Sequence, residues 1–172
     1  EYTQKLREML KELPGFCAEF FRGIENNTLV RTRYAYAGDL RNFFRFLISE
    51  VDGLKGCDIP SLPLSALDTV TTTDIERYLN YVSLYTDKEN NELVNNERAK
   101  ARKLATVRAL YKYFCKKEKL HNNPPSLVDM PTIRDRSIIR LEPEEVANLL
   151  DVVQNGDGLT ERQKQYHQRT QS

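Results

Sequence analysis

Apolar side chains recur every three or four residues along most of this chain, the spacing that places them on one face of an α-helix. A short helix is also expected around residues 16–24. No segment shows the strict alternation of a half-buried strand. The sequence therefore predicts an all-α fold, a bundle of four to five helices in which the apolar stripes converge. The four clearest stripes are Tyr2/Leu6/Met9/Leu13, Tyr36/Leu40/Phe43/Leu47, Ile75/Tyr78/Leu79/Val82 and Leu104/Val107/Tyr111/Phe114.

Local signals predict where these helices begin and end. Pro14 ends the first helix, because proline disfavours helical backbone at the residue before it. Thr73 and Glu76 have the spacing of a capping box, in which each side chain satisfies a free amide of the other residue. Residues 52–70 contain glycines and prolines, and residues 86–96 are rich in asparagine. Both segments are expected to form loops outside the bundle.

The chain is expected to contain one domain and the opening of a second. Residues 1–125 form the bundle, and residues 126–140 have the composition of an extended linker. Pro143 suits the first turn of a new helix, within a stub of residues 141–172. A lone amphipathic helix cannot bury its own face, so we expect the rest of that domain to be missing. The apolar face of this helix consists of Val146, Leu149 and Leu150.

Positive charge is concentrated in two segments. The whole chain has a net charge of only +1, yet residues 98–119 carry nine basic residues against one acid. Residues 31–45 carry four arginines against one aspartate, whereas residues 50–92 carry nine acids against three bases. A positive face can therefore be assembled from two separated segments, and such a face attracts a polyanion.

Composition narrows the possible functions. No run of about 18 apolar residues is present, so no membrane span is expected. Cys17, Cys57 and Cys115 lie far apart, which predicts reduced thiols packed as small apolar groups in a cytoplasmic protein. Only two histidines occur, and neither has metal-ligand spacing, so no metal or other cofactor is expected. No phosphate-binding loop or nucleophile–base signature marks an enzyme.

Five blocks of the sequence, in this order and spacing, resemble the N-terminal core-binding (SAM-like) domain of tyrosine recombinases, the phage-integrase and Xer-like enzymes. The resemblance covers about residues 10–150. The blocks are TRYAYAGDLRNFFRFL (32–47), TTTDIERYL (71–79), ARKLATVRALYKYF (101–114), NNP (122–124) and LEPEEVANLL (141–150).

The resemblance implies an orthogonal helical bundle that forms half of a clamp around double-stranded DNA and acts with other recombinase protomers in integration and recombination. The parent protein would be an enzyme, but no residue here matches its catalytic arginine or tyrosine motifs, so we expect no catalytic residue. Two helix starts would face the DNA. Their residues are Arg31, Thr32, Arg33, Tyr34, Arg98, Lys100, Arg102 and Lys103.

Several roles stay open at this point. Arg108 is as well placed to pair with an internal acid as to touch DNA, and Thr32 is as well placed to cap a helix as to donate to a phosphate. Asp39 is expected to pair with a nearby arginine. Lysines near the end of the basic helix suit a helix C-terminus without any ligand. The alternative function is a helical protein-interaction module that does not bind nucleic acid.

Overall fold

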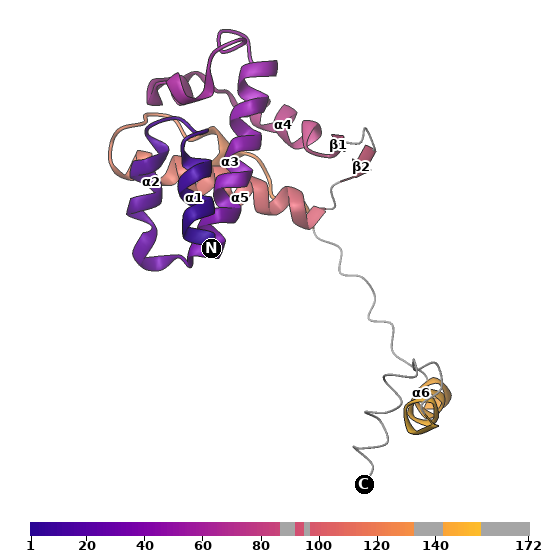
Figure 1. Ribbon diagram of the computed structural model, residues 1–172. Helices are drawn as coiled ribbons and strands as arrows, with labels where there is room; N and C mark the ends of the chain where they lie inside the picture. The colour runs from indigo at the N-terminus through magenta and orange to yellow at the C-terminus, as the bar shows by residue number, and fades with distance from the viewer. Residues whose placement is uncertain (87–91, 95–96, 133–142, 156–172) are drawn as a thin grey trace. The chain divides into compact units, whose positions relative to one another are not determined.

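The computed structural model describes residues 1–86, 92–94, 97–132 and 143–155. It divides into two compact units, Glu1–Arg134 and Asp135–Ser172. The first unit contains the helices between Tyr2 and Lys116, and the described part of the second unit is helix α6 (Pro143–Asn155) (Figure 1). Because the sequence stripes become helices, the all-α prediction is confirmed.

Helical elements account for almost all regular structure in the described part of the first unit. One β-hairpin is added to them: β1 and β2 pair antiparallel, with Tyr85 opposite Leu93. Residues 86–96 were predicted to be a loop, and that prediction was wrong for Thr86 and for residues 92–94, which form this pairing. The elements are α1 (Tyr2–Leu10), α2 (Cys17–Gly23), η1 (Glu25–Asn27), α3 (Val30–Glu50), η2 (Ile59–Ser61), η3 (Leu64–Thr69), α4 (Thr72–Tyr81), β1 (Leu84–Thr86), β2 (Glu92–Val94), α5 (Glu97–Lys116) and η4 (Pro124–Leu127).

The core forms where α1, α4 and α5 pack against the long helix α3 (Figure 1). The four residues of the α5 stripe are fully buried, whereas Tyr36 on α3 is only half-buried against the core. Edge-to-face aromatic pairs fill the centre, such as Phe43 with Tyr78 at 5.1 Å between ring centroids. Gly23 lets α2 approach α5, because a Cβ there would lie 2.2 Å from the Tyr113 ring.

The segment between α3 and α4 belongs to the core. Leu54, Leu62, Leu67 and Val70 are buried, and Tyr111 donates its hydroxyl hydrogen bond to the backbone oxygen of Leu67 at 2.9 Å. The prediction that residues 52–70 lie outside the bundle was therefore wrong. Its glycines and prolines correctly indicated turns, but the apolar residues between them cover the ends of the helices.

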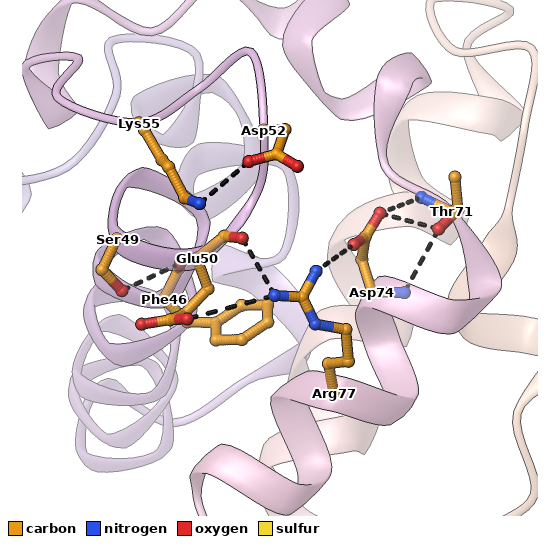
Figure 2. A network of polar contacts seen from close by, with 8 residues as sticks. All are labelled: Phe46, Ser49, Glu50, Asp52, Lys55, Thr71, Asp74 and Arg77. Atoms are coloured by element: carbon orange, nitrogen blue, oxygen red, sulfur yellow. Dashed lines mark hydrogen bonds and ion pairs between the residues drawn. The ribbon is translucent and has the colours of Figure 1, made fainter.

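The start of α4 is fixed by a capping box, two residues earlier than predicted. The Asp74 amide donates to the Thr71 hydroxyl at 3.2 Å, and the Thr71 amide donates to the Asp74 carboxylate at 3.0 Å. The predicted pair of Thr73 and Glu76 was wrong, because Thr71 and Thr73 both precede an acid by three residues and only the first pair forms the cap. Figure 2 shows Arg77 joining this cap to the end of α3: it donates to Asp74 at 3.2 Å and to the Glu50 carbonyl at 3.0 Å.

Helix α5 ends at Lys116 in a Schellman motif, in which a left-handed residue turns the chain out of the helix. Glu118 holds that position with a φ of 56°. The Lys119 amide donates to the Phe114 carbonyl at 3.0 Å, and the Glu118 amide donates to the Cys115 carbonyl at 3.0 Å. The chain therefore reverses over the end of α5 and does not continue as helix.

The described part of the second unit, α6 (Pro143–Asn155), begins at the proline that the sequence indicated. Val146 and Leu150 are exposed on it, and the side chain of Leu149 lies outside the described residues. The linker prediction falls partly on residues 133–142, which also lie outside them. Within the described ranges, no helix is both long and apolar enough to span a membrane.

The buried stripe of α5 yields a direct stability test. Leu104 is fully buried, so Leu104→Ala should lower the free energy of unfolding by about 2–5 kcal/mol through lost burial and a residual cavity. Leu127→Ala is the control, because Leu127 is 74% exposed and should change little. Urea denaturation followed by circular dichroism measures both. Equal effects from the two variants would contradict the packing described here.

Candidate nucleic-acid interface

A buried carboxylate, Asp39, lies where α3 crosses α5 and is only 2% exposed. The Arg102 guanidinium donates to its Oδ2 atom at 2.8 Å, and the Thr106 hydroxyl donates to the same oxygen at 3.2 Å. The Lys103 ammonium lies 3.5 Å from Oδ1. The expected pairing of Asp39 with an arginine is confirmed, and α5 supplies all three partners.

The electrostatics of this crossing are those of a buried ion cluster. Burial raises the pKa of Asp39 above its ordinary value, and the charges of Arg102 and Lys103 oppose that rise. Desolvating a charge is costly, so the carboxylate is tolerated only because cations and a hydroxyl surround it. The cluster therefore fixes which residues of α3 face which residues of α5.

The start of α5 carries the first group of predicted DNA-binding residues. Arg98 is exposed, and Lys100 pairs with Glu97 on its own helix. Arg102 keeps 49% of its side chain exposed while it contacts Asp39. Lys103 is only 8% exposed, although a residue expected to face DNA should lie on the surface. Its charged partner lies on α3, 64 residues earlier, where local sequence patterns do not reveal it.

The start of α3 carries the second group. Arg31 and Thr32 are exposed, and Arg33 pairs with Glu25 at 2.8 Å. Thr32 lies inside α3 and does not cap it, because Leu29 occupies the N-cap position. The Tyr34 ring is half-buried, as the packing of α1 against α3 requires.

Tyr2 on α1 is part of this surface, although the sequence analysis assigned it only to an apolar stripe. Its ring lies 5.7 Å from the Tyr34 ring between centroids, and the Arg31 guanidinium lies 6.0 Å from its centroid. An arginine near an aromatic ring is held by cation–π attraction. No local signal predicts this contact, because it depends on α1 packing beside α3.

The crossing at Asp39 brings the two helix starts into one region of the molecule. Val30 and Asp39 are nine residues apart on α3, which corresponds to about 14 Å along the helix axis. Glu97 and Arg102 are five residues apart on α5, about 8 Å. Along the helix axes, both starts therefore lie within about 14 Å of the crossing at Asp39.

The far end of α5 has a different role. Lys117 and Lys119 contact Glu19 on α2 at 3.1 and 2.7 Å. Hydrogen bonds from Lys119 and Lys117 lower the pKa of Glu19. These lysines hold the end of α5 against α2, as expected for a helix C-terminus without a ligand. Lys112 and Lys116 are exposed on the same helix.

Arg108 contacts backbone carbonyls, partners that the sequence did not indicate. Its Nε atom donates to the Pro125 carbonyl at 2.8 Å, and its guanidinium also donates to the Val128 carbonyl. It therefore holds the segment that leaves the bundle. Backbone carbonyls as partners give no sequence signal. Within the described residues, no cluster of three potential metal ligands is present.

Comparison with known proteins gives one informative match. The chain is 32% identical over 126 residues to "Tyrosine recombinase XerC" of Caldanaerobacter subterraneus subsp. tengcongensis, and the match covers 69% of this chain and 34% of that protein. The match supports a family relationship with the tyrosine recombinases. The chain thus spans about a third of the length of this relative. No protein-family model matches the sequence, and no solved structure matches it significantly.

Because Asp39 is surrounded by Arg102, Lys103 and Thr106, removing its carboxylate should strongly lower the stability of the fold. Asp39→Ala leaves Lys103 buried without its counter-charge, so the free energy of unfolding should fall by about 3–5 kcal/mol. Asp52→Ala is the matched control, because Asp52 is an exposed acid paired with Lys55 on the surface, and its loss should not shift the unfolding midpoint. The midpoints of urea unfolding of the two variants, compared with that of the unmodified protein, test this prediction. A fully stable Asp39→Ala variant would contradict the role given to the cluster.

Proposed function

We propose that residues 1–125 are the core-binding, DNA-binding half of a clamp in a site-specific tyrosine recombinase. In this proposal the unit holds double-stranded DNA together with other recombinase protomers, during integration and recombination. The relationship to a tyrosine recombinase supports the class. In this proposal the DNA-binding unit supplies no catalytic residue.

The observation that carries the proposal is the placement of the exposed cations. Arg31 lies at the start of α3 and Arg98 at the start of α5. These two helices cross at Asp39. Basic side chains at a helix start oppose the helix dipole, and an anionic partner relieves that local cost. At the start of α3, where no side chain caps the helix, amides of the first turn add further donors for phosphate. The two starts together therefore form a surface suited to a phosphate backbone.

The eight predicted DNA-binding residues divide into two groups under this proposal. Four are exposed and would contact DNA directly, and the other four hold the surface in place through contacts within the protein. The direct contacts would be Arg31, Thr32, Arg98 and Arg102. The supporting residues would be Arg33, Tyr34, Lys100 and Lys103.

Reversing charge at the two helix starts tests this surface. Arg31→Glu combined with Arg98→Glu should weaken binding to a DNA duplex strongly, because both changes replace attraction with repulsion. Lys112→Glu combined with Lys116→Glu is the control: it alters charge equally, at exposed positions farther along α5. Fluorescence anisotropy with a labelled duplex measures the affinities, and circular dichroism checks the fold.

The 172-residue chain should bind duplex DNA with a dissociation constant of about 10⁻⁴–10⁻⁶ M, the range of non-specific binding, because the proposed surface offers only a few phosphate contacts. Its log affinity should fall by about 0.9 per phosphate contact for each tenfold rise in salt. Equal losses from both double variants would indicate diffuse electrostatics and not a docked surface. No binding by any form would favour the protein-interaction module.

A further inference from the structure

Arg102 is a surface residue whose guanidinium is anchored from inside the protein. Half of its side chain is exposed, yet its Nη1 atom donates to a carboxylate that is only 3% exposed. A guanidinium has five N–H donors in a fixed fork, so one bond to Asp39 leaves others facing outward. Within the described residues, Asp39 is the only side chain that accepts a hydrogen bond from Arg102.

We propose that Asp39 is a positioning residue that holds Arg102 as a pre-ordered phosphate contact at the start of α5. This inference rests on the proposed function and deepens it. A long arginine side chain normally loses rotamer freedom when it binds a ligand, and that loss weakens affinity. Here folding has already restricted the side chain, so less of that freedom remains to be lost when DNA binds.

Lys103 completes the arrangement by balancing the buried charge. Its ammonium lies 3.5 Å from Asp39 and its side chain is only 10% exposed, so this positive charge stays inside. One acid and two cations leave one surplus positive charge in the cluster. Because Lys103 is buried and Arg102 is half-exposed, that surplus charge is presented on the surface by Arg102.

A second explanation of the Asp39–Arg102 contact predicts the opposite change in DNA affinity when the charge of Asp39 is removed, so the two can be distinguished. If Asp39 only neutralises the positive charge of Arg102, removing the negative charge of Asp39 should strengthen DNA binding. If Asp39 positions Arg102, the same change should weaken binding, although the protein becomes more positive. Asp39→Asn suits this comparison because it keeps the size of the side chain and one oxygen acceptor.

The experiment is a double-variant cycle on DNA binding with Asp39→Asn, Arg102→Ala and the two combined. Anisotropy with a labelled duplex is measured over a series of salt concentrations. We expect Asp39→Asn to lower affinity several-fold and to reduce the salt slope by about 0.9, the value of one phosphate contact. The combined variant should bind no worse than Arg102→Ala, because both changes remove the same contact. Tighter or unchanged DNA binding by Asp39→Asn would overturn the inference. So would a combined variant whose loss of affinity equals the product of the two single losses.

Arg102→Lys gives an independent test that does not disturb the buried acid. It keeps the charge but lacks the fork that can contact Asp39 and a phosphate together, so affinity should approach that of Arg102→Ala. Arg45→Lys, at an exposed position on α3 outside the proposed surface, is the matched control and should bind like the unmodified protein. If Arg102→Lys binds like the control, the positioning role is refuted. If the unmodified protein does not bind DNA at any salt concentration, the proposed function itself fails.

Discussion

The burial of one carboxylate, Asp39, between α3 and α5 constrains the rest of the first unit. A buried acid is tolerated only when cations and hydrogen-bond donors surround it, and α5 supplies Arg102, Lys103 and Thr106. These contacts fix the register of the two longest helices at their crossing. The positions of both helix starts follow from that register, and so does the proposed DNA surface.

Other polar contacts hold the ends of the helices, while apolar stripes supply the core between them. Arg77 joins α4 to the end of α3, and Glu19 joins α2 to the lysines after α5. Asp68 accepts hydrogen bonds from the amides of His121 and Asn122 at 2.9 and 3.3 Å, close to where Arg108 holds the exit segment. Burial works to raise the pKa of Asp68, and the bonds from His121 and Asn122 outweigh it and lower the pKa. At the far end of α5, Lys117 and Lys119 pair with Glu19 on α2, whereas at its start Arg102 pairs with Asp39 and still keeps 49% of its side chain exposed.

The fold was largely predictable from the sequence, because helical periodicity is a local property. The stripe from Leu104 to Phe114 and the start of α6 at Pro143 are examples. Features that depend on distant partners were not predictable. Lys103 resembles any surface lysine until Asp39 is brought beside it, and Arg108 binds carbonyls of a segment that follows the helix. The capping box was predicted two residues too late because Thr71 and Thr73 both precede an acid by three residues. Only packing selects the pair of Thr71 and Asp74.

The most direct test of the central claim is a titration of ¹⁵N-labelled protein with a DNA duplex, followed by NMR. We expect amide shifts to cluster at residues 31–34 and 98–103, at the starts of the two helices that cross at Asp39. Residues around Lys117 and Glu19, at the far end of α5, should shift little. Shifts centred on that far end, or spread evenly over all basic residues, would contradict the account.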